Sequence, residues 1–215
     1  MKKASVTRIS SARIPNEYGE YQLHLYQNSV DDKEHLALVY GDVSEKDEIM
    51  VRVHSECFTG DVLGSQRCDC GEQLQRAMQL IAEEGEGVVL YMRQEGRGIG
   101  LSEKLRAYNL QDQGHDTVEA NLLLGHQADA RDYTAAALML QDLGVRSVRL
   151  LTNNPSKIEQ LQELGIEIRS RIPLTPILVN EQNRRYLFTK MTRMSHMLNL
   201  PFGGQSDGVE FVRAQ

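Results

Sequence analysis

The three cysteines of the chain, Cys57, Cys68 and Cys70, lie in one short stretch, RVHSECFTGDVLGSQRCDCGEQL. Three thiols cannot all pair within one chain, and a clustered, odd set of cysteines is typical of a metal site. Zinc fits this donor set. Structural zinc sites close with four Cys or His ligands, whereas catalytic sites keep three and leave the fourth position to water, whose pKa then falls to about 7.

Two alternatives to an open zinc site stand beside it. His54 precedes Cys57 by three residues, so a closed site of three cysteines and one histidine has suitable spacing. In the second alternative, the cysteines bind no metal and are small apolar residues of a core. Their neighbours Glu56, Arg67 and Asp69 are charged rather than aliphatic, which favours the metal site.

A glycine-rich segment, EGRGIG, follows an apolar run and precedes a helical pattern. Backbone N–H groups at such a place can hold a phosphate, although the segment matches neither the lysine-containing phosphate loop nor the dinucleotide fingerprint. A plain turn is the alternative. Glu95 and Arg97 favour a nucleotide, because a carboxylate can accept from a guanine N–H edge and a guanidinium can bind phosphate through two N–H groups.

Two later loops add charged side chains. GHQADARDY carries Asp129, Arg131 and Asp132 just before a helical pattern, where helix capping by one of the aspartates, with a salt-bridged arginine, is the alternative reading. LLTNNPSK places Thr152 at a strand end and Lys157 in a first helical turn. A lysine there opposes the helix dipole unless an anion is bound, and a solvated surface lysine is the alternative.

The secondary structure predicted around these residues changes at the cysteines. Strand patterns dominate before them, and strands alternate with helices after them, so we expect an α/β fold with a strand-rich N-terminal half and a mixed sheet flanked by helices. Residues 1–200 are expected to form a single domain and 201–215 a loose tail. The predicted strands are ARIPNEYGEYQLHLYQ (a pair), HLALVYGDV, EIMVRVHSE, GVVLYMR, VRSVRLLTNN and IEIRSRI. The predicted helices cover Leu74–Ile81, LSEKLRAY with Leu101, Leu105 and Tyr108 on one face, DYTAAALMLQDLG, and PSKIEQLQELG.

Composition excludes several classes of partner. The 215 residues carry a net charge of −6, which argues against a sequence-independent grip on nucleic acid, although a local arginine cluster could hold a small anion. No apolar run is long enough to span a bilayer, so no membrane partner is expected. The N-terminus lacks the apolar segment of a signal peptide, so we expect a cytoplasmic protein.

Four stretches in this order, RVHSECFTGDVLGSQRCDCG, RQEGRGIGL, LQDQGHDTVEAN and LLTNNP, resemble GTP cyclohydrolase II from about Arg8 to Leu198. The resemblance implies the first committed step of riboflavin biosynthesis, in which GTP becomes 2,5-diamino-6-ribosylamino-4(3H)-pyrimidinone 5′-phosphate, formate and pyrophosphate. It also implies one Zn²⁺ per subunit, Mg²⁺ with the triphosphate, and a homodimer. Some members carry an additional butanone-phosphate synthase domain, for which this length leaves no room, so the monofunctional form is expected.

The resemblance also assigns roles by position. Asp129 matches the proton acceptor and Arg131 a nucleophile, although a guanidinium gives up a proton reluctantly and an electrostatic clamp is chemically easier. In GHQADARD, His126 departs from the apolar or aromatic residue that the family usually carries after this glycine. The implied metal ligands are Cys57, Cys68 and Cys70, and the implied substrate contacts are Arg52, Val53, His54, Ser55, Glu56, Gln73, Glu95, Gly96, Arg97, Thr117, Thr152 and Lys157.

Two rival functions remain open at this point. Family members that open the imidazole ring but keep the formyl group differ at the position of Tyr108, so its presence predicts full deformylation. Without the family context, Tyr108 would equally be a core-facing aromatic. A non-catalytic zinc module that binds nucleic acid would need a fourth ligand and a basic face, and the sequence offers neither clearly.

Overall fold

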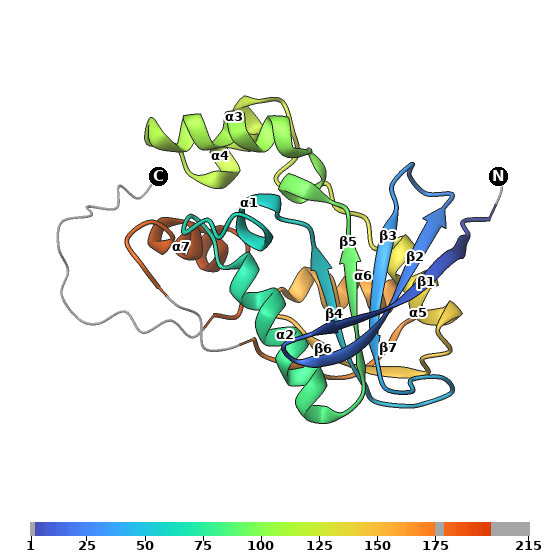
Figure 1. The fold of residues 1–215 in the computed structure, drawn as a ribbon. Coiled ribbons are helices and arrows are strands. Elements are labelled where there is room, and N and C mark those ends of the chain that lie inside the picture. The colour runs from blue at the N-terminus through green and yellow to red at the C-terminus, as the bar shows by residue number, and fades with distance from the viewer. Residues whose placement is uncertain (1–2, 175–178, 199–215) are drawn as a thin grey trace.

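The computed structural model describes residues 3–174 and 179–198. Its centre is a seven-stranded sheet in the order β1-β2-β3-β5-β4-β6-β7 (Figure 1). The predicted mixed sheet is therefore confirmed. The strands are β1 (Val6–Asn16), β2 (Gly19–Asn28), β3 (His35–Tyr40), β4 (Ile49–Ser55), β5 (Gly87–Met92), β6 (Ser147–Leu151) and β7 (Glu167–Ile172).

The N-terminal half of the sheet is antiparallel. β1 and β2 form the expected antiparallel strand pair, from Val6 opposite Asn28 to Asn16 opposite Gly19, with one shift of register between Arg8 and Ser10. β3 pairs with β2 and then with β5, again antiparallel. Alternate residues of β3 are buried, as expected of a strand with one face on the core.

The other half is parallel and positions the site. β4 lies between β5 and β6, and β7 follows β6, all in parallel. All of β4 except its last residue, Ser55, is buried, as is typical of a central parallel strand covered on both faces. In open α/β sheets ligands bind beyond the carboxyl ends of such strands, and Cys57, Glu95 and Thr152 follow β4, β5 and β6 there.

Helices cover both faces of the sheet (Figure 1). α2 (Cys70–Glu84) packs Ala77 and Ile81 against one face, and α5 (Thr134–Asp142) and α6 (Pro155–Glu163) cover the other. α6 begins as expected, with Pro155 in its first turn and the Asn154 side chain capping it. The remaining helical elements lie off the sheet: α1 (Phe58–Asp61), η1 (Glu95–Gly98), α3 (Leu101–Asp112), α4 (Thr117–Leu123) and α7 (Arg184–Arg193).

The structure corrects the predicted face of α3. Leu101 and Leu105 are exposed, whereas Lys104 and Ala107 are buried. The helix covers a polar pocket rather than an apolar core, so its buried side does not follow its leucines. α4 and α7 were not predicted either, although α4 begins with a capping box between Asp116 and Glu119.

The expected loose tail, 201–215, lies outside the described residues. Within the described residues, the helices are too short or too polar for any of them to cross a bilayer.

Candidate active site

The three cysteine sulfurs converge between the end of β4 and the start of α2. Their Sγ atoms all lie within 4.8 Å of one another, and those of Cys57 and Cys68 are 3.7 Å apart. Two thiolates on one tetrahedral zinc, at Zn–S distances of about 2.3 Å, are separated by roughly 3.8 Å. Gly60 lies beneath the cluster, where an added Cβ would fall 2.8 Å from the Cys68 sulfur. The donor set and its spacing fit zinc.

His54 does not complete the cluster. Its Nε2 lies 3.1 Å from both carboxylate oxygens of Asp61, and no fourth Cys, His, Asp or Glu joins the three sulfurs within the described part of the chain. Asp61 also accepts hydrogen bonds from the Cys57 N–H at 2.9 Å and the Tyr91 hydroxyl at 2.8 Å. His54 thus supports the cysteine loop, and the alternative of a closed site with histidine is not what this geometry shows.

The thiols share charge unevenly. Hydrogen bonds from Cys68 and Cys70, together with the nearby Lys104 ammonium, hold the pKa of Cys57 well below its usual range. The hydrogen bond to Cys57 raises the pKa of Cys68 to about 11. The Lys104 ammonium therefore favours the thiolate form of Cys57, and a metal bound by the cluster would displace the protons of the cysteines.

The glycine-rich segment turns back on itself at η1. Gly96 and Arg97 both have positive φ, near 63° and 62°, which makes a tight left-handed turn. The Glu95 carboxylate accepts the Phe58 and Gly96 N–H groups, both at 2.7 Å, and the Lys104 ammonium at 2.8 Å. Both Glu95 oxygens are thus used within the protein, and its reading of a guanine edge stays a prediction.

Arg97 has the opposite character. Its Nη1 and Nη2 are buried and meet no hydrogen-bond partner in the part of the chain that the structure describes. An unsatisfied guanidinium is costly unless an anionic ligand completes it. The segment therefore places the Arg97 guanidinium in the pocket, where it is available to bind an anion.

Further cations are buried around it. Arg52 donates to the Leu151 carbonyl at 3.0 Å and to Gln73 Oε1 at 2.8 Å. Lys157 donates to the Val53 carbonyl, and the side chain of Val53 is fully buried in β4. Burial, and then the charges of Arg52 and Arg131, lower the pKa of Lys157 well below 10.5. An anion bound in this pocket would favour the charged form of Lys157 and so raise its pKa again.

Asp129 and Arg131 form a pair joined at two points. Arg131 Nε donates to Asp129 Oδ1 at 2.8 Å and its Nη2 donates to Oδ2. Burial raises the pKa of Asp129, but the hydrogen bonds and charge of Arg131 outweigh it and hold that pKa below its usual value. The alternative reading, helix capping by one aspartate beside a salt-bridged arginine, is also met here, because Asp132 accepts the Thr134 N–H at 2.6 Å while Arg131 pairs with Asp129.

Tyr108 points its hydroxyl toward the cysteines. That oxygen lies 3.4 Å from Thr59 Oγ1, which is 3.7 Å from Cys57 Sγ. Arg67 covers the ring at 4.4 Å from its centroid, and burial raises the pKa of the phenol. Tyr108 is therefore part of the pocket wall next to the cysteine cluster and not a core residue.

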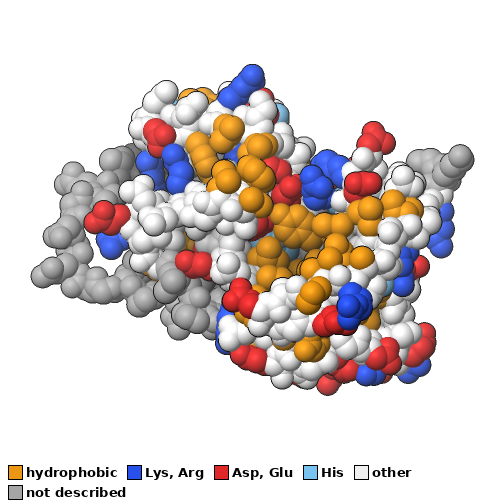
Figure 2. Space-filling view, viewed as in Figure 1, with side chains coloured by type: hydrophobic (Ala, Val, Ile, Leu, Met, Phe, Trp, Pro, Cys, Tyr) orange, Lys and Arg blue, Asp and Glu red, His pale blue; other side chains and the backbone are white. Residues whose placement is uncertain are grey.

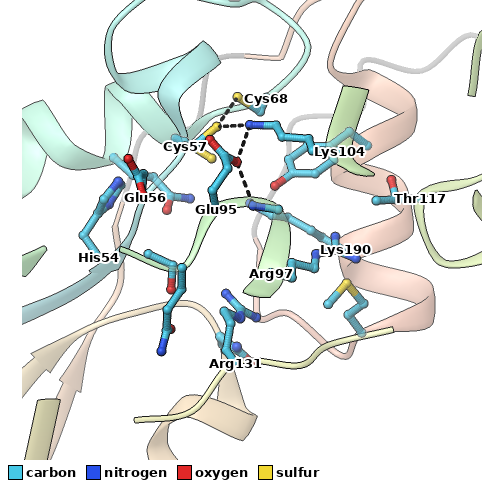
Figure 3. Close-up of a pocket in the computed structure, with 18 of the residues that line it drawn as sticks. His54, Glu56, Cys57, Cys68, Glu95, Arg97, Lys104, Thr117, Arg131 and Lys190 are labelled. Carbon is cyan, nitrogen blue, oxygen red and sulfur yellow. Dashed lines mark hydrogen bonds and ion pairs between the residues drawn. The ribbon is translucent and has the colours of Figure 1, made fainter. Parts of the chain in front are cut away.

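Nearly all of the residues expected from the sequence line this one pocket; Figure 3 shows several pointing into it. Val53 and Asp129 are not in the wall and reach it through Lys157 and Arg131. The wall is formed, among those expected, by Arg52, His54, Ser55, Glu56, Cys57, Cys68, Cys70, Gln73, Glu95, Gly96, Arg97, Tyr108, Thr117, Arg131, Thr152 and Lys157.

Sequence reasoning missed a second set of wall residues. Lys104 reaches the pocket from α3, and Tyr186, Lys190 and His196 reach it from α7 and the segment after it. Lys104 stands four residues before Tyr108 on the same helix, which was the available signal. The α7 residues follow no motif, so only the fold places them.

The comparisons with known proteins agree with this picture. A family profile described as GTP cyclohydrolase II matches residues 7–173. The riboflavin biosynthesis protein RibBA of Chlamydia muridarum is 57% identical over 203 residues, 94% of this chain and 48% of its own length. The RibBA protein of Mycobacteroides abscessus is 58% identical over 198 residues, 90% of this chain and 47% of its own. The chain thus spans about half the length of these curated relatives.

A solved structure is also similar at a lower level. RibBX of A. baumannii, described as a two-domain 3,4-dihydroxy-2-butanone 4-phosphate synthase, gives a TM-score of 0.44 at 23% identity, over 80% of this chain and 40% of that one. A likeness of this size adds nothing to the assignment of the site.

Proposed function

The chain belongs to the GTP cyclohydrolase II family, and from this premise we propose that it is a zinc-dependent hydrolase that converts GTP to 2,5-diamino-6-ribosylamino-4(3H)-pyrimidinone 5′-phosphate, formate and pyrophosphate. One observation carries the proposal: a three-cysteine cluster and a set of buried cations line the same pocket. The reaction needs both, because it opens a base and cleaves a triphosphate. It would be the first committed step of riboflavin biosynthesis.

Cys57, Cys68 and Cys70 would hold one zinc ion per subunit and leave its fourth position open. When bound, zinc supplies Lewis-acid chemistry and acidifies a water molecule near neutral pH. The chain's own contribution is to place the guanine ring against the cluster, with Tyr108 beside it and His54 and Asp61 fixing the loop below.

Arg97, Arg52 and Lys157 would bind the triphosphate. Arg97 offers two terminal nitrogens, Nη1 and Nη2, without partners in the described part of the chain, and Lys157 gains the counter-charge that its buried position lacks. Mg²⁺ would travel with the triphosphate oxygens, since the cysteines are the single cluster of metal-type ligands within the described residues. Acidic composition elsewhere does not oppose this local binding.

Arg131 would act as a clamp on the phosphoryl group undergoing attack. Burial lowers its pKa, but Tyr133 and Asp129 more than compensate, so the guanidinium stays protonated. A protonated guanidinium is a poor nucleophile and a good partner for developing phosphoryl charge. Asp129 would then orient Arg131, and the nucleophile and proton-acceptor roles implied by the family remain the alternative.

The nearest alternative product is a ring-opened nucleotide that keeps its formyl group. Tyr108 supports full deformylation, because its hydroxyl lies near the cysteine cluster, where a second water must be placed. A non-catalytic zinc module for nucleic acid finds less support, since the pocket's cations are buried rather than spread on a surface.

The deciding experiment counts products. Zinc-loaded protein is incubated with GTP and Mg²⁺, and formate and pyrophosphate are measured per GTP consumed. One of each supports the proposal. Pyrophosphate without formate would indicate the formyl-retaining variant, and the absence of both would return the cysteines to a structural role.

A homodimer is part of the proposal. Exposed apolar side chains gather over α1, α3 and α4 (Figure 2), and a second copy would cover them. The exposed set comprises Phe58, Val62, Leu63, Leu101, Leu105, Leu122 and Leu123. Light scattering tests it. The monofunctional form and the cytoplasmic location stay predictions from the sequence.

A further inference from the structure

Lys104 is a buried cation to which the proposed reaction gives no task. It is 8% exposed, on the inward side of α3. Its Nζ lies 3.1 Å from Cys57 Sγ and 2.8 Å from Glu95 Oε1, as the dashed lines of Figure 3 show. A buried ammonium is costly unless it is paired, so this position needs both partners.

Glu95 extends the same arrangement to the backbone. Its other oxygen, Oε2, accepts the N–H of Phe58 at 2.7 Å, the peptide that follows Cys57. Cys57 is thus held at two points, at its sulfur by Lys104 and at the next peptide by Glu95. The two holding groups are joined to each other by their ion pair.

The glycine-rich turn makes room for this contact. Gly96 has φ +63°, and an added Cβ would lie 3.2 Å from Lys104 Cβ and 3.1 Å from Ile99 Cγ1. A side chain at position 96 would be strained in the backbone and would crowd the lysine. One reason for glycine in EGRGIG is therefore the approach of α3 to the cysteine loop, apart from any phosphate.

We infer that Lys104 is a positioning residue of the metal centre, which donates an N–H···S hydrogen bond to the Cys57 thiolate and, with Glu95, fixes the direction of that ligand. The inference rests on the zinc site of the proposed function. A hydrogen bond to a coordinating thiolate withdraws electron density from sulfur, so the metal keeps more Lewis acidity. Groups that orient metal ligands in this way typically contribute 10–100-fold to metal affinity.

The test uses the full chain loaded with Co²⁺, whose thiolate charge-transfer band reports the sulfur ligands directly. Lys104→Met removes the charge and the donor at similar length, and Lys104→Gln removes the charge and ends its amide one bond short of the ammonium position, away from the sulfur. Arg106→Met is the matched control, because Arg106 is an exposed cation on the same helix, paired with Glu103 rather than with the cysteines. Circular dichroism establishes that each variant is folded.

The expected result has two parts. In each folded neutral variant of Lys104 the band moves to lower energy, because an unbonded thiolate gives up charge more easily, and the metal dissociation constant in chelator competition rises roughly 10–100-fold. Arg106→Met leaves both unchanged. If Lys104→Met fails to fold, Lys104→Gln gives the decision by the same two measurements.

A band at the wild-type position and an affinity within about twofold of wild type, in either folded neutral variant, would overturn the inference. The spectrum does not depend on GTP turnover. A wild-type protein that binds Co²⁺ through three thiolates but releases no formate would therefore defeat the proposed reaction while leaving the role of Lys104 to be decided by its own test.

Discussion

Lys190 Nζ lies 2.6 Å from Asp69 Oδ1, and both side chains are buried. Asp69 stands between two of the cysteines, and Lys190 lies on α7, beyond the residues that the family profile matches. The other Asp69 oxygen accepts from Gln73 Nε2 at 2.6 Å, and Gln73 in turn accepts from Arg52. A continuous polar network thus joins α7 to β4 beside the cysteine cluster.

Breaking this pair should destabilise the protein. Lys190→Met leaves the Asp69 carboxylate buried without a counter-charge, which typically costs about 3–5 kcal/mol in the free energy of unfolding. The double variant Lys190→Met/Asp69→Asn should recover part of that loss. Urea unfolding of both single variants and the double variant measures the coupling, with Arg184→Met on the exposed side of α7 as the control. Strictly additive effects would contradict a direct interaction.

Lys157→Met should stabilise the free protein and weaken GTP binding. The lowered pKa of Lys157 means that the folded state binds fewer protons than the unfolded state between that pKa and about 10.5. Wild-type stability should therefore rise with pH in this window, and the advantage of Lys157→Met should shrink toward pH 10. Thermal unfolding across pH checks the sign.

Calorimetry supplies the functional half of the same prediction. Because burial lowers the pKa of Lys157 and a bound triphosphate favours its charged form, GTP binding should raise that pKa and take up protons in the wild type at pH values between the two pKa values, and this uptake should be reduced in Lys157→Met. Titrations in buffers of different ionisation enthalpy measure it. Lys46→Met, whose parent lysine pairs with Glu86 outside the pocket, is the control. Equal uptake in wild type and Lys157→Met would exclude Lys157 as the source.

Metal removal should separate binding from chemistry. Cys68→Ser removes one of the proposed metal ligands, and chelation of the wild type removes the metal itself. The proposed ring opening requires that metal, so formate release should fall at least about 100-fold in both cases. The cations that would bind the triphosphate are other residues, and GTP binding should persist within roughly tenfold. Equal loss of both would indicate that the metal is needed to shape the pocket itself.

The sequence predicted the pocket best where chemistry and strand ends coincide. Cys57, Glu95 and Thr152 each follow a parallel strand, so the sheet alone brings them together. The spacing of the cysteines could not decide whether His54 was a fourth ligand, because that depends on which way one imidazole turns. In the structure the His54 imidazole pairs with the Asp61 carboxylate instead. The periodicity of helices and strands does not predict a contact of this kind.

Lys104 and Lys190 were missed for a different physical reason. Helical periodicity identifies the buried side of a helix by its apolar residues, and α3 instead covers a polar pocket with Lys104 while its leucines face outward. α7 reaches the site only through long-range packing, and Lys190 lies 121 residues from its partner. The contact of Lys190 leaves no local pattern in the chain, and the only local trace of Lys104 is its four-residue spacing from Tyr108.

Arg131 variants should distinguish a clamp from a nucleophile. Arg131→Lys keeps the charge but loses the two-point geometry, so pyrophosphate release should fall about tenfold, whereas Arg131→Ala should fall about 1,000-fold. Rapid quenching followed by mass spectrometry should find no phosphorylated arginine in the wild type. A trapped phospho-arginine adduct at this position would replace the clamp with the covalent mechanism.

Tyr108→Phe should divert the reaction to the ring-opened formamide. The change removes the hydroxyl near Thr59 and the cysteines but keeps the ring under Arg67, so the pocket wall should stand. Water would then be poorly placed for the second hydrolysis, while ring opening and pyrophosphate release continue. Chromatography of the products should show the formamide accumulating, with formate per pyrophosphate falling at least about tenfold, within the range that positioned proton-transfer groups contribute. Thr59→Val tests the same hydroxyl from its partner and should give a smaller shift in the same direction. A formate-to-pyrophosphate ratio that stays at one in Tyr108→Phe would show that this hydroxyl does not place the second water.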